Sequence, residues 1–176
     1  MEIIIRSGTS SDLPAYTELL QKLYEEFYVD ESLGLTKACF SKEIFATPDT
    51  QGYLAGNLQT NDNQHCFLAF DDEKLVGSIT IKDHGNEYEV QGFYVAASYQ
   101  GKGIGKKLWK KAVAVARDKD IVIDLYAHNT KAIAMYKKWG FVIDVSKGTF
   151  YRHWPEWTDG LQAKCLYMRR KHDEMI

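Results

Sequence analysis

The spacing of hydrophobic residues changes along the chain between two periods, one typical of strands and the other typical of helices. Runs rich in β-branched and aromatic residues predict strands over residues 2–6, 65–70, 74–82, 88–95, 121–127, 141–145 and 161–168. Apolar residues at helical spacing predict helices over residues 13–28, 36–45, 104–117 and 131–139, and Pro48 opens a further helical or irregular stretch.

The order of these elements predicts the class of fold. Residues 65–95 contain three successive strands joined by short turns, and such strands pair antiparallel. The helix that follows carries the chain to a strand that must lie parallel to its predecessor. We therefore expect an α/β (α+β) fold, with a mixed sheet and helices on its faces. The chain has no internal repeat, low-complexity segment or linker, so we expect residues 1–176 to form a single domain.

Composition and charge exclude several classes of protein. The 176 residues are 45% hydrophobic and carry a formal net charge of −2, which gives no general attraction to nucleic acid or to an anionic membrane. No apolar run approaches the roughly 18 residues of a membrane span, and the N-terminus lacks the basic region and cleavage site of a signal peptide. The three cysteines form no Cys-x-x-Cys pair, so we expect no disulfide, no metal site and a cytoplasmic location.

A glycine-rich turn separates the predicted strand 88–95 from the predicted helix 104–117. Its sequence, Gln-Gly-Lys-Gly-Ile-Gly, occupies residues 100–105. Glycines at the start of a helix let a ligand approach the backbone, and the free N–H groups of the first helical turn then point at that ligand. Those N–H groups and the helix dipole attract anions, above all phosphate. The turn therefore predicts a binding site for a pyrophosphate.

Three phosphate-binding motifs compete for this turn. A P-loop needs Ser or Thr after its lysine, but Lys107 follows Lys106. The dinucleotide fingerprint Gly-x-Gly-x-x-Gly would have Lys106 in place of its third glycine, although Asp124 lies about 20 residues on, where a ribose-binding acid would stand. The pattern Gln/Arg-x-x-Gly-x-Gly/Ala fits residues 100–105 fully. It resembles the acetyl-coenzyme A pyrophosphate motif of the GNAT superfamily of N-acetyltransferases.

A second block, residues 125–141, strengthens this resemblance. It contains Asn129, Ala132, Tyr136 and the pair Gly140-Phe141. Their spacing is similar to that of the GNAT signature Asn-x-x-Ala-(x)3-Tyr-(x)3-Gly-Phe. The resemblance covers residues 66–145 closely, and within the superfamily the chain looks most like small bacterial enzymes that act on polyamines or other small amines.

The resemblance implies a sheet of about seven strands that is splayed between its fourth and fifth strands, with acetyl-coenzyme A as cosubstrate in the cleft. The N–H of Val95 would face the thioester oxygen and stabilise the developing oxyanion, and Gly92 is the expected site of a bulge in this strand. The residues implied to contact the coenzyme are Phe93, Tyr94, Val95, Gln100, Gly101, Lys102, Gly103, Ile104, Gly105, Lys106, Asn129, Ala132 and Tyr136.

Two residues are candidates for catalysis. Tyr136 matches the family tyrosine that stands near the sulfur and gives a proton to the departing thiolate. Glu89 aligns with a catalytic glutamate of some superfamily members and would take a proton from the attacking amine, directly or through water. In other members the acid lies at the position of Gln91, which cannot act as a base, and many relatives rely on ordered water and backbone carbonyls.

Acidic and aromatic residues predict the acceptor. Acids at residues 25, 26, 30 and 31 and the aromatic loop 151–157 would flank the cleft and suit a small cationic amine, although the acids also fit a solvated helix end. The residues expected to bind this substrate are Tyr24, Glu25, Tyr28, Gln91, Tyr151 and Trp154.

Other functions fit the same residues. A protein N-terminus, a lysine side chain or an aminoglycoside is an alternative acceptor. A module that binds or senses acetyl-coenzyme A without turnover would need the same phosphate-binding turn, and a nucleotide-binding α/β domain is a further alternative. The resemblance also makes a homodimer possible.

Overall fold

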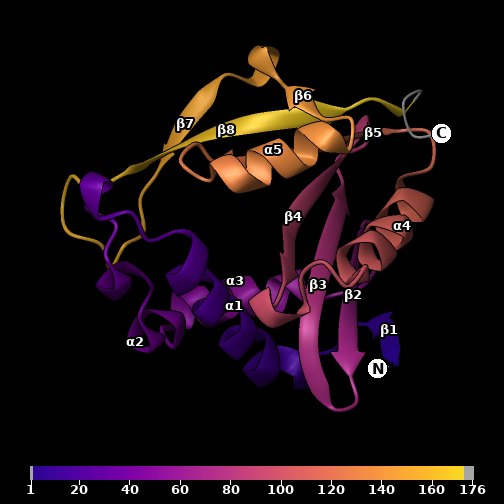
Figure 1. Ribbon diagram of the computed structural model, residues 1–176, viewed down its shortest axis with the longest axis horizontal. Coiled ribbons are helices and arrows are strands. Elements are labelled where there is room, and N and C mark those ends of the chain that lie inside the picture. The colour runs from indigo at the N-terminus through magenta and orange to yellow at the C-terminus, as the bar shows by residue number, and fades with distance from the viewer. Residues whose placement is uncertain (1, 173–176) are drawn as a thin grey trace.

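The computed structural model describes residues 2–172, which form a mixed sheet of eight strands with helices on both faces (Figure 1). The strands are β1 (Ile3–Ser7), β2 (Gln64–Asp71), β3 (Lys74–Asp83), β4 (Glu87–Val95), β5 (Asp120–Tyr126), β6 (Val142–Ile143), β7 (Thr149–Arg152) and β8 (Ala163–Arg170). The helices are α1 (Leu13–Phe27), α2 (Lys42–Phe45), α3 (Pro48–Asn57), α4 (Ile104–Ala116) and α5 (Thr130–Lys138). None of the helices within residues 2–172 combines the length and apolar sequence that crossing a membrane requires.

The sheet is mixed, as the order of elements predicts. Its strands follow the order β1-β2-β3-β4-β5-β8-β6, and β7 pairs with β8 as well. The one parallel pair among these strands is β4 with β5, because α4 connects them as a crossover. The predicted fold class is therefore confirmed.

Two local details differ from the sequence-based expectation. The sheet has eight strands instead of about seven, because residues 149–152 form β7 beside β8 and not a loop. The helix predicted over residues 36–45 is divided into a 3-10 turn (Lys37–Phe40) and the short α2. The division occurs because Ser41 is extended and its side chain accepts a hydrogen bond from the N–H of Ile44, which starts a new helix.

β4 and β5 are paired over only part of their length. Their register runs from Glu87 opposite Asp120 to Val90 opposite Ile123 and then ends. Beyond these pairs the two strands diverge, so that β1–β4 and β5–β8 form two halves of the sheet that open away from each other (Figure 1). The expected splay between the fourth and fifth strands is thus present.

A bulge in β4 lies next to the point of divergence. Thr80 of β3 faces Gly92, while the next residue, Ile81, faces Val90, so Gln91 is the extra residue. A side chain at position 92 would meet the ring of Tyr94, whose Cε2 atom lies 2.6 Å from where the Cβ would stand. Glycine therefore lets the Tyr94 ring fold back over its own strand.

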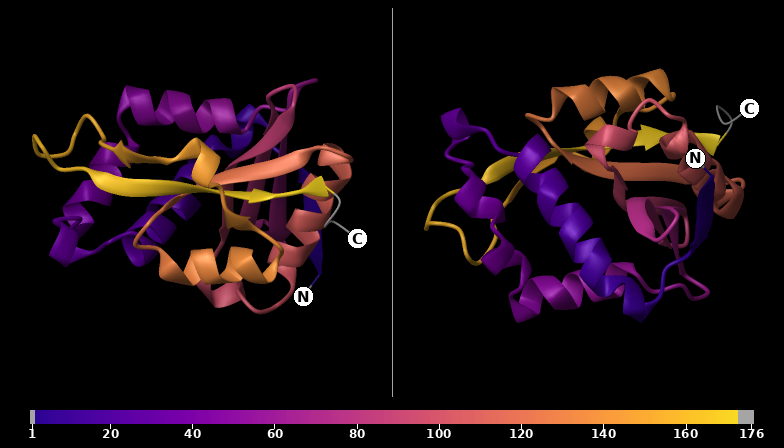
Figure 2. Two further views of the ribbon diagram at one scale, coloured as in Figure 1. Left: turned by 90° about the horizontal axis from the view of Figure 1, so that it is seen from above. Right: turned by 60° about the horizontal axis from the view of Figure 1, so that its bottom comes forward.

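The helices divide into two layers, each with its own core. Leu19, Leu20 and Leu23 of α1 pack with residues of α3 and with Leu68 of β2 on one face of the sheet. Leu108 and Ala112 of α4 pack on the opposite face with apolar residues of β3, β4 and β5, and α5 covers the same face. Figure 2 shows α4 and α5 on the other side of the sheet from α1 and α3.

One arginine connects the strands at the paired end of β4 and β5. The guanidinium of Arg169, on β8, contacts Glu87 of β4 at 2.7 Å, Asp120 of β5 at 3.0 Å and Asp144 at 2.7 Å. Burial alone would raise the pKa of these carboxyls, but their hydrogen bonds, including those from Arg169, outweigh it, and each pKa lies below its ordinary value. This cluster holds together the end of the sheet from which the two halves open.

Candidate functional site

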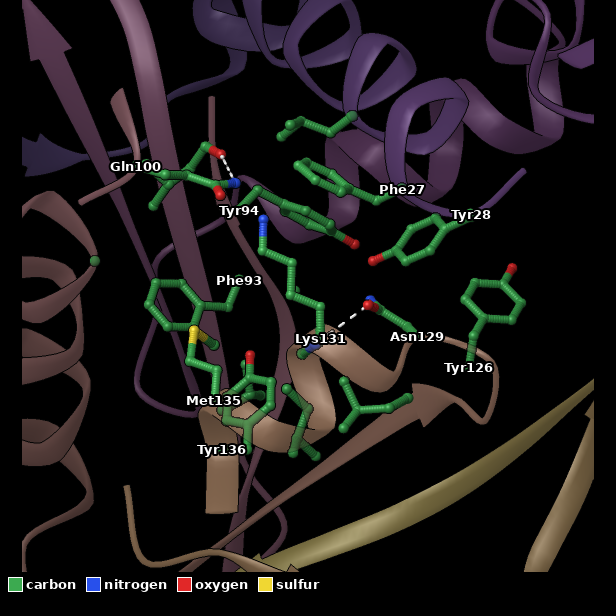
Figure 3. A pocket seen from close by; sticks show the side chains of 18 of the residues that line it. Phe27, Tyr28, Phe93, Tyr94, Gln100, Tyr126, Asn129, Lys131, Met135 and Tyr136 are labelled. Atoms are coloured by element: carbon green, nitrogen blue, oxygen red, sulfur yellow. Dashed lines mark hydrogen bonds between the residues drawn. The ribbon is translucent and has the colours of Figure 1, made fainter. Parts of the chain in front are cut away.

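A cavity of about 520 Å³ lies where β4 and β5 separate. Its walls come from the turn before α4, the free edge of β4, one face of α5 and the C-terminal part of α1 (Figure 3). We call one end the glycine end, where Gly101, Gly103, Gly105 and Lys106 line the wall, and the other the tyrosine end, lined by Tyr24, Tyr28, Tyr94 and Tyr126.

The glycine end is the start of α4. Gly103 is the N-cap and has φ of +82°, a conformation that glycine adopts without strain. A Cβ at Gly103 would meet no protein atom within 4 Å, so the backbone there is open to a ligand. The first i to i−4 hydrogen bond of the helix is donated by Lys107, which leaves the N–H groups of Ile104, Gly105 and Lys106 without an acceptor inside the helix. The positive end of the helix dipole therefore faces the cavity.

The free edge of β4 forms a second wall. The N–H of Ala96 donates to Val76 on β3 at 2.9 Å, and successive N–H groups of an extended strand point to opposite sides. The N–H of Val95 therefore points away from β3, toward the side that β5 has left open. The carbonyl oxygen of Val95 accepts a hydrogen bond of 3.1 Å from the side chain of Gln100, which ties the glycine turn to the strand end.

α5 contributes residues to the middle of the cavity. Asn129 caps this helix, its Oδ1 accepting from the N–H of Ala132 at 3.2 Å. Lys131 extends into the cavity, with its Nζ 5.5 Å from the ring centre of Phe27 (Figure 3). The side chain of Tyr136 lies next to that of Met135 and its hydroxyl points into the cavity (Figure 3).

Burial determines the protonation state of Tyr136. The residue is only 3% exposed, and this burial raises the pKa of its hydroxyl well above the ordinary value. At neutral pH the hydroxyl therefore keeps its proton. A protonated phenol at this place can donate a hydrogen bond, or a proton, to a group in the cavity.

The tyrosine end is built by rings from three elements. Tyr24 of α1 and Tyr94 of β4 join their hydroxyls in a hydrogen bond of 3.0 Å, and burial raises the pKa of both well above the ordinary value. Tyr28 and Tyr126 lie side by side, with ring centres 4.8 Å apart. Tyr126 is 3% exposed, and its hydroxyl has no hydrogen-bond partner among the described residues.

An ion pair also lines the cavity beside the tyrosine end. Nη2 of Arg152, on β7, donates to Oδ1 of Asp124, on β5, at 2.6 Å. The guanidinium carbon lies 5.1 Å from the ring centre of Tyr126 and 5.3 Å from that of Phe150. Of the described residues that line the cavity, Asp124 is the one carboxylate, and the cations are Arg152, Lys106 and Lys131.

Most of the residues predicted to contact a coenzyme line this cavity. They are Phe93, Tyr94, Val95, Gln100, Gly101, Gly103, Gly105, Lys106, Asn129, Ala132 and Tyr136. Lys102 and Ile104 are not among the lining residues. The Lys102 ammonium lies 4.9 Å from the ring centre of Tyr99, and the Ile104 side chain is buried in the core beneath α4.

The residues predicted for catalysis and acceptor binding are divided. Tyr136, Tyr24, Tyr28 and Gln91 line the cavity, whereas Glu89, Glu25, Tyr151 and Trp154 do not. Glu89 lies in the paired part of β4 and forms an ion pair with His84 at 2.7 Å. Tyr151 is 58% exposed, and Trp154 stacks on Trp157 behind Tyr24. The acids at residues 26, 30 and 31 also lie outside the lining.

Several lining residues had not been expected from the sequence. Asp124 and Arg152 are 28 positions apart, and only the pairing of β7 and β5 with β8 brings them together. Lys131 lies inside the recognised motif, but at a position where that motif accepts any residue. Residues 2–172 contain no group of three or more His, Cys, Asp or Glu side chains placed to hold a metal ion, and Cys39, Cys66 and Cys165 are buried free thiols.

The known proteins that this chain resembles in sequence are acetyltransferases. Residues 17–141 match the sequence profile of the Acetyltransferase (GNAT) family. The spermidine N(1)-acetyltransferase of Thermoplasma acidophilum is 27% identical over 160 residues, which cover 85% of this chain and 94% of that protein. The N-alpha-acetyltransferase RimI of Mycobacterium tuberculosis is 33% identical over 82 residues, or 44% of this chain, and the match spans only about half of RimI, 52% of its length.

Solved structures show the same fold. The PaiA N-acetyltransferase from Thermoplasma acidophilum, crystallised in complex with coenzyme A, superposes with a TM-score of 0.73. The superposition covers 97% of this chain and 99% of that chain at 23% sequence identity. The fold of this chain is therefore shared with a protein that was crystallised in complex with coenzyme A.

Proposed function

We propose a function from one premise, that the chain belongs to the GNAT acetyltransferase family. In this proposal it transfers the acetyl group of acetyl-coenzyme A to a primary amine, with both substrates bound at once. The observation that carries the proposal is the continuity of the cavity. One cavity joins the glycine end to the tyrosine end, so an amine at the tyrosine end can reach a thioester whose phosphates are held at the glycine end.

The glycine end fits the diphosphate of the coenzyme. The N–H groups of Ile104, Gly105 and Lys106 have no acceptor in the helix, and the open space at Gly103 admits phosphate oxygens close to the backbone. Lys106 and Lys131 also line the cavity and supply positive charge for the phosphates. In this role the glycines provide access, and the N–H groups and lysines provide attraction.

The edge of β4 fits the extended arm that connects the diphosphate with the thioester. Because β5 has diverged, the N–H groups on this edge face the cavity and can bond amide groups of the arm as an added strand would. The N–H of Val95 donates to the carbonyl oxygen of the thioester. That hydrogen bond strengthens as the oxygen gains negative charge, which lowers the barrier to attack.

Tyr136 serves the departing sulfur. The amine loses a proton to water and attacks the thioester carbon as a free base, forming the C–N bond, and the C–S bond then breaks with its electron pair going to sulfur. The Tyr136 hydroxyl gives its proton to that thiolate. The nitrogen of the new amide gives up its second proton, which returns through water to the Tyr136 phenolate, and the amide product and free thiol leave. Glu89 takes no part in this proposal, because it lies outside the cavity and is paired with His84.

The acceptor proposed from the sequence was a small cationic amine. Relatives named for spermidine and for N-alpha-acetylation support an amine acceptor. The acids at residues 25, 26, 30 and 31 do not line the cavity, and so they give no support for a cationic one. We therefore propose a small primary amine.

The decisive experiment measures thiol release from acetyl-coenzyme A in the presence of a panel of amines. The panel contains spermidine, diamines, amino acids, an aminoglycoside and short peptides with a free N-terminus. We expect release with at least one small amine, together with a mass increase of that amine by one acetyl group. Tight binding of coenzyme A with no release on any acceptor would overturn the proposal and favour a sensing module.

A further inference from the structure

The tyrosine end lacks the net negative charge that would attract a polyamine. The described lining residues contain three cations and one carboxylate, and that carboxylate, Asp124, is already bonded to Arg152. Lys106 and Lys131 are balanced by the phosphates when the coenzyme is bound. The ion pair of Asp124 with Arg152 then remains, with no net charge, and an acceptor carrying several ammonium groups would meet the guanidinium with like charge.

Arg152 has binding capacity that the described residues do not use. A guanidinium carries five N–H groups in a rigid planar fork, and the hydrogen bond made here by Nη2 to Asp124 accounts for one of them. The ring centres of Tyr126 and Phe150 lie 5.1 and 5.3 Å from its carbon and hold its position. The side chain is 30% exposed, so it is accessible from the cavity that it lines.

Tyr126, whose ring packs against the same guanidinium, offers a second donor for an anionic ligand. Its hydroxyl is buried and has no hydrogen-bond partner in residues 2–172, and burial raises its pKa to about 12. The hydroxyl therefore keeps its proton and offers a donor beside the guanidinium. Leaving a buried donor without a partner is unfavourable, and a ligand oxygen at this place would remove that cost.

We propose that the acceptor is an amino acid, whose carboxylate binds Arg152 and Tyr126 while Asp124 receives hydrogen bonds from its amine. This inference rests on the proposed function and names the substrate class of the same site. A guanidinium next to a carboxylate is complementary to a molecule that carries one amine and one carboxylate. The acceptor then supplies a partner for both members of the ion pair and for the Tyr126 hydroxyl.

The test compares acceptors that differ only by a carboxylate. The pairs are lysine with cadaverine, ornithine with putrescine, and phenylalanine with phenethylamine. For each compound we would measure kcat/KM for thiol release, and separately the thermal unfolding temperature with saturating coenzyme A. We expect the amino acid of at least one pair to exceed its amine in kcat/KM by about tenfold or more, the effect of one or two hydrogen bonds to a charged group.

Three variants test whether Arg152 causes the preference for the amino acid over the matching amine. In Arg152→Met, the ratio of kcat/KM for the amino acid to that for the amine should fall about 10- to 100-fold. The double variant Asp124→Asn with Arg152→Met should show the same fall in this ratio. It leaves no unpaired carboxylate at position 124. Lys164→Met removes a similar charge from an exposed position on β8 outside the cavity, and its ratio should equal that of the unaltered protein.

The outcomes separate this inference from the proposed function. Turnover of amines with no preference for the amino acid in any pair, or a ratio unaffected by Arg152→Met, would overturn the inference and leave the function standing. If no compound is turned over, the unfolding temperature decides. Stabilisation by amino acids that is lost in Arg152→Met would support an amino-acid binding site at Arg152 and contradict acetyl transfer, since a ligand stabilises the fold that binds it. If no compound is turned over and none stabilises the protein, the inference and the proposed function are both overturned.

Discussion

At the scale of single residues, burial determines what the tyrosines of the cavity can do. It raises the pKa of Tyr24, Tyr28, Tyr94 and Tyr136 above the ordinary value, so each hydroxyl remains protonated at neutral pH. Each can therefore donate a hydrogen bond, and none is available as a base. Of the four, Tyr136 lies on α5, in the segment that resembles the GNAT signature, and we propose it as the proton donor.

Tyr136→Phe tests that role. We expect kcat/KM to fall about 10- to 100-fold, at the lower end for general acid catalysis, because a thiolate whose acid has a pKa of about 8.5 leaves readily. The dissociation constant of coenzyme A should change little, because the hydroxyl acts on the sulfur only during transfer. Since burial raises the pKa of Tyr136, the loss should persist over the whole neutral and weakly basic range.

A matched control separates this loss from the removal of any buried hydroxyl. Tyr16 is fully buried outside the cavity, and its hydroxyl has no hydrogen-bond partner among the described residues. Tyr16→Phe should therefore retain full activity. An unchanged rate for Tyr136→Phe at every pH would show that the hydroxyl does not assist the departing sulfur.

At the scale of elements, the cavity depends on the places where β4 stops pairing and α4 begins. The bulge at Gln91 and Gly92 follows directly after the last pair of β4 with β5. As a result Gln91 lines the cavity, while Glu89, two residues earlier, remains in the paired part of the strand. The turn at Gly103 then returns the chain so that the start of α4 faces the edge that β4 leaves free.

Gly103→Val tests the phosphate-binding role of the start of α4. A branched side chain there would fill the open space that the phosphates need, so we expect coenzyme A to bind at least about tenfold more weakly, the loss of one charge-assisted hydrogen bond or more. Isothermal titration calorimetry would measure the change in dissociation constant.

The control must carry the same backbone strain. Gly160 has φ of +81°, nothing within 4 Å of its Cβ position, and no part in the cavity. Gly160→Val should therefore cost similar stability and leave coenzyme binding unchanged. Equal coenzyme affinity in both variants would show that the phosphates do not bind at the start of α4.

At the scale of the whole molecule, the sheet must open at one end and remain closed at the other. The Arg169 cluster closes it, because the guanidinium joins β4, β5 and the segment after β6 to β8. The three carboxylates of this cluster have lowered pKa values, so they stabilise the fold above the unfolded pKa of about 4. That stabilisation is lost as the pH falls through their folded pKa values, because the unfolded chain takes up protons first.

We predict that the Arg169→Met variant is less stable than the unaltered protein by an amount that depends on pH. At neutral pH we expect the free energy of unfolding to fall by about 3 kcal/mol, the lower end for breaking a buried ion pair. Without the guanidinium, burial and mutual repulsion should raise the pKa of the carboxyls, so the folded variant takes up protons first as the pH falls. The deficit relative to the unaltered protein should therefore begin to shrink as the pH falls through these raised pKa values, and shrink further below about pH 4, where the unaltered protein loses its own stabilisation.

Urea unfolding at neutral and acidic pH would measure this deficit. Arg169→Lys keeps the positive charge but not the planar fork that reaches three carboxylates, and its deficit should be intermediate. A deficit that is the same at both pH values would show that the cluster contributes by packing and not by its charges.

Local patterns of residues specify most of the elements and the turn at the glycine end, because these depend on neighbours a few residues apart. The strand and helix periods, the glycines of residues 100–105 and the cap at Asn129 act through local backbone geometry, which the order of residues specifies directly. For the same reason most of the residues expected to contact the coenzyme do line the cavity.

The residues at the tyrosine end come together through contacts between segments that lie far apart in the chain. Glu25 and Glu89 were plausible from the sequence, yet neither lines the cavity, because helix rotation and the length of strand pairing set where their side chains lie. Asp124 and Arg152 meet there because β8 pairs with both β5 and β7. Such contacts depend on the register of strands distant in the chain, and no local pattern of residues encodes that register.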